Sequence, residues 1–148
     1  MFEKVVIMIA MSQVHWAEFE IPALDPPGHS MVGHSSWYGS GISNDFGLHG
    51  SITATGEPFD PSRKTCATRS TPLRRMVRVK LLRNGRSILC LVNDRGPYGA
   101  ILESGEWALK LSSSDPGDWR GIIDLSRASA EAIGFDFNSG LEEVEVSW

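Results

Sequence analysis

The chain has 148 residues, of which 41% are hydrophobic and 22% are charged, a composition typical of one soluble globular domain and not of a disordered chain. The net charge of −4 argues against a nucleic-acid-binding protein, because such proteins usually carry a basic face. The 15 glycines and 8 prolines cluster between short apolar runs, which favours a loop-rich β fold over a helical bundle.

Residues 1–33 are predicted to be an N-terminal extension of a domain that covers residues 34–148. The apolar run Val5–Met11 resembles a weak signal peptide, but it could equally be a first strand or an arm that contacts a larger assembly. The run is far too short to span a bilayer. The breaker cluster Asp25–Gly28 separates the extension from the domain.

The first half of the domain is predicted to contain short strands and one long loop. Ser35–Tyr38 is a predicted strand, and a loop rich in Gly, Ser and Asn follows over residues 39–56. Met76–Leu82 and Ser87–Val92 are predicted partner strands, joined by a type I′ turn at Asn84–Gly85. Basic residues alternate with valines in the first of these two strands, which indicates a solvated face rather than a phosphate-binding patch.

The second half begins with another predicted loop, over residues 98–121, in which glycine and proline break any regular pattern. Ile122–Leu125 is a predicted short strand. Ser126 is suited to cap a helix that ends at Gly134, because serine is a preferred N-cap and glycine a preferred C-terminal stop. The alternating segment Glu142–Trp148 is predicted to be the closing strand.

The sequence predicts no metal site and no cofactor. Cys66 and Cys90 lack metal-binding spacing, as do the four histidines, and the glycine-rich segments lack the Lys-Ser/Thr pair of a phosphate-binding loop. Cys90 lies in an apolar run, which is typical of a buried inert thiol. A disulfide between the two cysteines in an oxidising compartment remains open.

Three carboxyl groups beside Gly, Pro or a strand end are candidates for acid/base chemistry: Glu57, Asp94 and Asp124. Asp94 follows an apolar strand, where partial burial can raise a carboxyl pKa, but it could equally be a turn residue that binds the Gly96 amide. For Asp124 a structural role at the helix start is favoured. Glu57 has no structural signal apart from exposure.

Aromatic residues lie in or beside the predicted loops. They are Trp37, Tyr38, Tyr98, Trp107 and Trp119. Aromatic faces stack on sugars and also fill cores, so the pattern leaves both roles open.

From about residue 34 to 148, the order and spacing of several motifs resemble those of the rare-lipoprotein-A (RlpA) domain of septal-ring lytic transglycosylases. The most specific part is Asn93-Asp-Arg-Gly-Pro97 with a downstream Ile122-Ile-Asp-Leu-Ser126 and an Ala-rich helix. The further matches are Ser36–Gly39, Leu48–Gly50, Thr53–Glu57, Thr65–Arg69 and Asn84–Ser87.

The resemblance implies a mainly β fold, a six-stranded double-psi β-barrel with one or two short helices and long loops. It also implies cleavage of peptidoglycan glycan strands without water, in which the muramic acid 6-hydroxyl attacks its own anomeric carbon. The family's catalytic acid and base corresponds to Asp94, and its second functional acid to Glu57. The expected substrate contacts are Trp37, Tyr38, Thr68, Arg95, Tyr98 and Asp124.

The sequence departs from the family in three ways. Thr68 stands where the family has a histidine, and threonine cannot titrate, so proton shuttling at that position is lost. The loop over residues 98–121 is longer than the family's usual link and could form a lid or a partner contact. The family's lipobox and C-terminal peptidoglycan-binding repeat are absent from the sequence.

Several functions therefore remain open. The chain is expected to be a transglycosylase of peptidoglycan, a non-catalytic or weakly active glycan-binding module, or a structural protein of a virion or envelope. The expected location is the periplasm, the envelope or the exterior, or alternatively a bacteriophage tail. Residues 1–33 and 98–121 are the segments expected to contact other virion or envelope proteins, and neither a nucleic-acid partner nor a membrane span is predicted.

Overall fold

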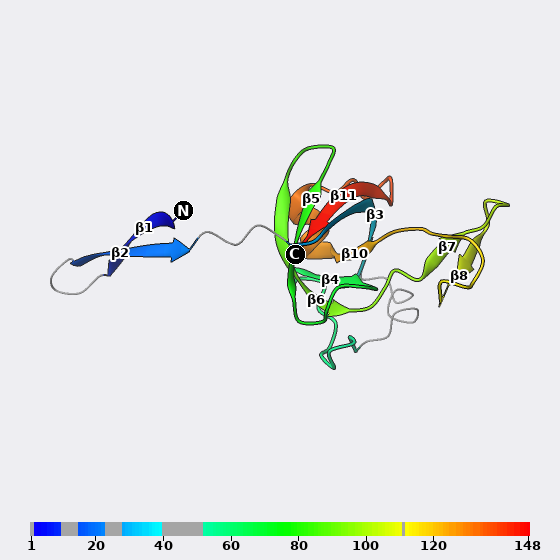
Figure 1. Ribbon diagram of the computed structural model, residues 1–148, viewed down its shortest axis with the longest axis horizontal. Coiled ribbons are helices and arrows are strands. Elements are labelled where there is room, and N and C mark those ends of the chain that lie inside the picture. Colours follow the sequence, from blue (N-terminus) through cyan, green and yellow to red (C-terminus); the bar gives the residue numbers. More distant parts are fainter. Residues whose placement is uncertain (1, 10–14, 23–27, 40–51, 111) are drawn as a thin grey trace.

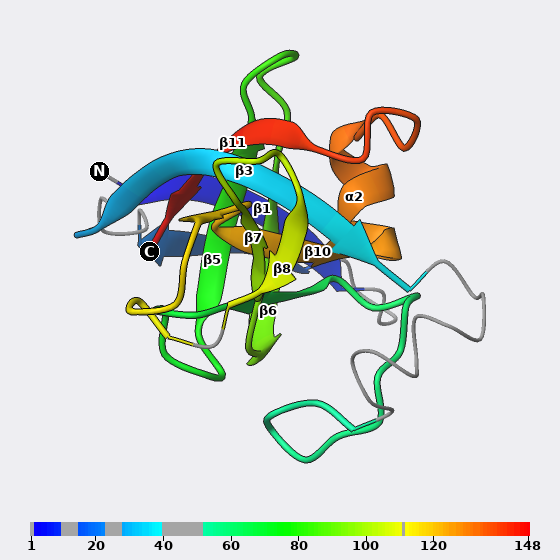
Figure 2. The same cartoon turned by 90° about the vertical axis from the view of Figure 1, so that its right-hand side faces the viewer.

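A computed structural model describes residues 2–9, 15–22, 28–39, 52–110 and 112–148. Six strands close into a barrel in the order β10-β3-β11-β5-β6-β4 (Figures 1 and 2). Their bounds are β3 Ser30–Tyr38, β4 Thr65–Thr68, β5 Met76–Leu81, β6 Ser87–Asp94, β10 Ile123–Ser126 and β11 Glu142–Ser147. The predicted mainly β, six-stranded barrel is confirmed.

Two of the strand pairs in the barrel are parallel. Strand β10 runs parallel to β3, and β4 runs parallel to β6, whereas the other neighbours in the barrel are antiparallel. Parallel neighbours come from segments far apart in the chain, because a parallel pair needs a long crossover connection. Each parallel pair therefore brings together residues that the sequence separates widely.

The barrel is filled by alternate residues of its strands. In β5 the side chains of Val77, Val79 and Leu81 are buried while their neighbours are exposed, as the predicted half-buried strand requires. Val144 and Val146 of β11 point into the same core from the neighbouring strand. Apolar burial of this kind contributes roughly 1.5–3 kcal/mol per large side chain.

Helix α2, Arg127–Ile133, follows β10 and has the predicted caps. The Ser126 hydroxyl oxygen accepts a hydrogen bond from the Ser129 amide at 3.2 Å. Gly134 ends the helix in the left-handed conformation, with φ 75°. The Asn84 side chain donates to the Ile133 carbonyl at 2.8 Å, which ties the helix end to the β5–β6 turn.

That turn differs from the type I′ turn predicted at Asn84–Gly85. A type I′ turn needs a positive φ at both central residues, but only Gly85 has one, with φ 72°. The Leu81 amide instead donates to the Arg86 carbonyl and the Gly85 amide to the Leu81 carbonyl, both at 2.8 Å, so the loop is longer. The reason is tertiary, because the Asn84 side chain is engaged by the helix end and by the Arg86 amide.

Residues 98–121 are not an irregular loop. They contain a three-stranded antiparallel sheet in the order β8-β7-β9, with β7 Gly99–Ile101, β8 Trp107–Leu109 and β9 Asp118–Trp119. Figure 1 shows β7 and β8 to one side of the barrel. Strands of two or three residues are too short to produce a hydrophobic period, which explains why the sequence pattern did not reveal them.

Residues 2–22 contain a hairpin of β1, Phe2–Ile9, and β2, His15–Pro22. The first barrel strand begins at Ser30, so residues 30–33 pair with β11 although the predicted domain starts at residue 34. Residues 25–27 of the predicted breaker cluster, residues 40–51 of the first loop and the Leu48–Gly50 motif lie outside the described part of the chain.

Candidate active-site cleft

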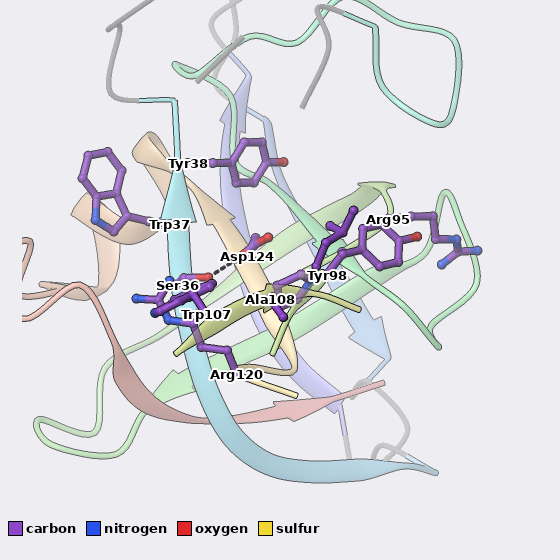
Figure 3. A pocket seen from close by; sticks show the side chains of 13 residues that line it. Ser36, Trp37, Tyr38, Arg95, Tyr98, Trp107, Ala108, Arg120 and Asp124 are labelled. Carbon is purple, nitrogen blue, oxygen red and sulfur yellow. Dashed lines mark hydrogen bonds between the residues drawn. The ribbon is translucent and has the colours of Figure 1, made fainter. Parts of the chain in front are cut away.

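A cleft of about 520 Å³ lies between the outer face of β3 and β10 and the strands β7 and β8 (Figure 3). It is lined by three sets of residues that are distant in sequence. These are Ser36–Tyr38, then Arg95–Gly99 with Trp107–Leu109, and finally Arg120 with Asp124. The barrel supplies one wall and the sheet within residues 98–121 supplies the other.

Asp124 is the carboxyl group that lines this cleft. It lies opposite Ser36 in the parallel β10–β3 register, and the Ser36 hydroxyl donates a hydrogen bond to Asp124 Oδ1. Asp124 is 8% exposed, and a side chain at Gly96 would come within 3.3 Å of its Oδ2. The structural role favoured for Asp124, capping the helix, is filled by Ser126 instead.

Tyr38 lies on the same face of β3 as Ser36, because the two residues are two positions apart on one strand. Its ring packs at a tilt against Phe59, with centroids 4.7 Å apart. Burial raises the pKa of the Tyr38 phenol well above its ordinary value, and the negative charges of Asp94 and Asp124 add to the rise. Tyr38 is therefore protonated at neutral pH and lies within the electrostatic reach of both carboxylates.

Asp94 is the last residue of β6 and is half-buried. Its Oδ1 accepts hydrogen bonds from the amides of Ala54, at 3.1 Å, and Arg95, at 2.9 Å. The amide of Gly96, the partner expected of a turn residue, is not among them. Oδ2 has no hydrogen-bond donor within the described residues, so one carboxylate oxygen is anchored and the other is open. Asp94 lies beside the cleft and is not one of its lining residues.

Glu57 belongs to the segment of residues 52–58, which docks on the end of β6. The Ala54 amide binds Asp94, and the Thr55 amide donates to the Asn93 carbonyl at 3.2 Å. Glu57 Oε2 forms an ion pair with Arg63 at 3.2 Å, in which both side chains are about half exposed. The structure thus attaches the segment that carries Glu57 to Asp94, while Glu57 itself is outside the cleft lining.

Thr68 and Arg95 occupy structural positions. Thr68 is fully buried, and its hydroxyl oxygen accepts a hydrogen bond from the Thr71 amide at 3.2 Å, so its side chain has no surface for a substrate. Arg95 borders the cleft, but its guanidinium donates to the carbonyls of Thr68, at 3.2 Å, and Thr71. The substrate contact expected of Thr68 is therefore not supported by its placement.

The aromatic candidates divide between core and cleft. The Trp37 ring packs edge-on against Phe137, with centroids 4.6 Å apart, and belongs to the margin of the barrel core. In Figure 3 it points away from Asp124 and Tyr98. Tyr98 lines the cleft and is 36% exposed, so it retains the expected surface for a sugar.

Several cleft residues were not predicted as site residues, among them Ser36, Trp107, Leu109 and Arg120. The Arg120 guanidinium carbon lies 3.9 Å from the centre of the Trp107 ring. Burial lowers the pKa of Arg120, and the charge of Asp124 opposes that effect. Trp107 is in β8 and Arg120 follows β9, and these two strands lie on either side of β7, so their contact becomes visible only once the strand order of this sheet is known.

Among the residues that the structure describes, no group of three or more His, Cys, Asp or Glu side chains is arranged to hold a metal ion. Within the same residues, no helix has the length and apolar character that a membrane crossing demands.

Residues 30–146 match the family model described as lytic transglycolase, and the chain belongs to this family of double-psi β-barrels. It is 37% identical over 125 residues to the endolytic peptidoglycan transglycosylase RlpA of Pseudomonas aeruginosa, covering 84% of this chain and 29% of that protein. It is 32% identical over 117 residues to the RlpA protein of the same description from Neisseria meningitidis, covering 79% and 38%. The chain therefore spans well under half the length of these curated relatives.

Among solved structures, a Streptomyces papain inhibitor aligns with 82% of this chain and 96% of its own, at a TM-score of 0.49 and 24% identity.

Proposed function

We propose that this chain is a lytic transglycosylase that cleaves the bond between N-acetylmuramic acid and N-acetylglucosamine in peptidoglycan glycan strands. The proposal is supported by its family and by the names of its relatives. The observation that carries it is the Asp94 carboxyl group, which has one oxygen anchored by two backbone amides and one oxygen open, beside the cleft.

In this mechanism Asp94 acts twice. Its protonated carboxyl group first gives a proton to the glycosidic oxygen as the bond to the anomeric carbon breaks. The muramic acid 6-hydroxyl then attacks that carbon, and the Asp94 carboxylate accepts the hydroxyl proton. The product ends in 1,6-anhydromuramic acid, the proton that Asp94 donated has been replaced, and no water is consumed.

Two further carboxylates have roles in the proposed mechanism. Glu57, on the segment that docks against Asp94, contributes negative charge beside the developing positive charge of the sugar ring. Asp124, held by Ser36 within the cleft, accepts a hydrogen bond from a sugar hydroxyl. Tyr98 provides an aromatic surface for a sugar face.

The test is mass spectrometry of the products after incubation with intact and peptide-stripped peptidoglycan. Products ending in 1,6-anhydromuramic acid are expected from the wild type. Asp94→Asn preserves both amide contacts at Oδ1 but cannot donate an acidic proton, and we expect a loss of about a hundredfold or more. The matched control is Asp118→Asn, an exposed aspartate of β9, which should cleave like the wild type. Reducing-end products, or full activity of Asp94→Asn, would contradict the mechanism.

A second candidate function is glycan binding without cleavage. It is favoured by Thr68, which stands at the position of the family's histidine and is fully buried. Measurable binding to glycan strands with no product of either kind, from a folded wild-type chain, would establish this candidate in place of the first.

We further propose that the chain acts at the bacterial cell envelope, where its substrate lies, with a phage virion as the alternative location. Residues 1–33 and the sheet within residues 98–121 are the proposed contacts to other envelope or virion proteins. Recovery of the protein from purified virions would identify the virion as its location, and recovery from periplasm with a cleaved leader would identify the envelope.

A further inference from the structure

Arg69 is a barrel residue whose side chain contacts both ends of the segment that forms the sheet wall of the cleft. It comes directly after β4, and its guanidinium donates a hydrogen bond to the Pro97 carbonyl, where the chain leaves the barrel. The guanidinium carbon also lies 3.8 Å from the centre of the Trp119 ring in β9, shortly before the chain returns to the barrel. One side chain therefore connects the barrel to the start and to the end of this segment.

Trp119 is fixed within the sheet to which it belongs. It pairs with Ala100 of β7. The Lys110 ammonium nitrogen lies 5.1 Å from the centre of the same ring, and it donates to the carbonyls of Ser113, at 3.4 Å, and Asp115. Lys110 is 4% exposed, so the ring and the ammonium group are part of the packing of the sheet itself. A group that holds the Trp119 ring therefore holds the sheet.

The sheet is joined to itself more than to the barrel. The Lys110 amide donates to the Tyr98 carbonyl at 2.8 Å, and the Arg120 amide donates to the Gly99 carbonyl at 2.9 Å. In the described part of the chain, no strand of this sheet is hydrogen-bonded to a barrel strand. The position of the sheet relative to the barrel therefore depends on the side chains at its two ends.

The two walls of the cleft belong to these two parts of the molecule. Asp124 lies on the barrel wall, and Tyr98 and Trp107 lie on the sheet wall (Figure 3). Burial lowers the pKa of the Arg69 guanidinium and the charge of Asp124 opposes that effect, so the guanidinium is within electrostatic reach of the barrel wall. Arginine suits both of its contacts at once, because a flat guanidinium stacks on a ring while its edge donates hydrogen bonds.

We propose that Arg69 is a positioning residue that holds the sheet wall of the cleft at a fixed place against the barrel, so that both walls contact a bound glycan together. The choice of a glycan as ligand rests on the proposed function, but the placement of the sheet does not. Arg69 acts through Pro97 and Trp119, and it is not one of the residues that line the cleft.

The first test measures the orientation of the sheet relative to the barrel from residual dipolar couplings in NMR spectra. In the wild type, the amides of both parts should fit a single alignment tensor. Arg69→Met keeps an unbranched chain but neither donates to Pro97 nor places a charge on Trp119. Its sheet amides should lose the common tensor and show smaller couplings than the barrel amides. Arg78→Met, an exposed arginine of β5, is the matched control and should keep one tensor.

Variants of the ring test the same contact from the sheet side. Trp119→Leu should loosen the sheet as Arg69→Met does, and the double variant should loosen it no further, because both changes break one contact. Trp119→Phe keeps an aromatic face and should restore the common tensor. A common tensor in both folded Arg69→Met and folded Trp119→Leu, or two tensors in the wild type, would overturn the proposal. The leucine variant decides the matter where Arg69→Met does not fold.

The second test measures the affinity of the same proteins for soluble glycan strands released from peptidoglycan. We expect Arg69→Met to bind about tenfold more weakly than the wild type, with the loss in KM and not in kcat where the strands are cleaved. Unchanged affinity in a variant whose sheet has lost the common tensor would overturn the claim that both walls contact the glycan. A wild type that binds no glycan would refute the proposed function, while the couplings would still show whether Arg69 holds the sheet.

Discussion

Ser36 and Asp124 face each other across the parallel pair of β3 and β10, and the Ser36 hydroxyl donates a hydrogen bond to Asp124 Oδ1. The two residues are 88 positions apart in the chain. Their bond stabilises a carboxylate that is almost wholly buried on the barrel wall of the cleft. A small hydroxyl side chain on one strand thus holds the acid supplied by the other.

Replacement of Ser36 by alanine should therefore destabilise the protein. The Asp124 carboxylate would lose one of its donors in a largely desolvated position, at a cost of about 1–3 kcal/mol. Urea denaturation followed by circular dichroism measures this change. Ser87→Ala, at the exposed start of β6, is the control and should stay within about 0.5 kcal/mol of the wild type. Equal stability of the two variants would show that the Ser36 bond contributes little.

Replacement of Gly99 by alanine should displace Trp107. The added Cβ would lie 2.4 Å from the indole, so the ring must move, and the guanidinium that rests on it must move as well. We expect a loss of about 1–3 kcal/mol in stability. Gly28→Ala is the matched control, because nothing lies within 4 Å of its added Cβ and its φ is not positive.

The Trp107 resonances in an NMR spectrum measure the displacement directly. A Gly99→Ala protein with an unchanged Trp107 environment would contradict the role given to this glycine.

The stability of the folded protein should fall in acid as Glu142 becomes protonated. The Arg83 side chain donates two hydrogen bonds to its carboxylate, at 2.5 and 3.1 Å, and the pKa of Glu142 is lowered from its ordinary 4.5, first by these bonds and then also by the Asp136 amide. Because the folded-state pKa is below the unfolded one, the contribution is complete above pH 4.5. It is lost as the pH falls through the lowered folded-state pKa.

The measurement is the free energy of unfolding from urea titrations between neutral pH and about pH 3. Glu142→Gln should be less stable at neutral pH and should show a flatter decline below pH 4.5. Glu143→Gln, on the exposed side of the same strand, is the comparison variant and should keep the wild-type slope. If the free energy of unfolding declined equally steeply with falling pH in Glu142→Gln and in the wild type, Glu142 would not be the group responsible.

The two cysteines should be unreactive in the folded protein. Cys66 and Cys90 are fully buried with their sulfur atoms 2.7 Å apart, and burial raises the pKa of the Cys66 thiol, so little reactive thiolate is present. In reducing buffer, a thiol reagent should label neither residue until denaturant is added, and both thereafter. Mass spectrometry counts the labels, and rapid labelling of the native chain would contradict the burial. The disulfide that the sequence left open is tested by labelling the denatured chain without reductant, since a disulfide would leave both cysteines unlabelled.

Local patterns of the sequence predicted the elements that depend on neighbouring residues. The alternation in β5, the Ser126 cap and the Gly134 stop each involve residues within a few positions of one another, and each agrees with the structure. The six-stranded barrel was implied by the resemblance to the family, and the structure confirms it.

Long-range pairing decided the rest. The sequence marked Thr68 as a substrate contact, but whether a strand residue meets the cleft depends on its neighbours in the barrel, and the Thr68 side chain is fully buried. Trp37 is shared between two places, because it lines the cleft and its ring also packs against Phe137 at the margin of the core. The sequence marked Asp94 and Asp124 without showing that the charges of both raise the pKa of Tyr38. That effect requires β6 and β10 to lie in one barrel with β3, the strand of Tyr38. The sequence marked Trp107 only as one of several loop aromatics, and it did not mark Arg120. Their contact is made by a sheet whose strands are too short to leave a period in the sequence.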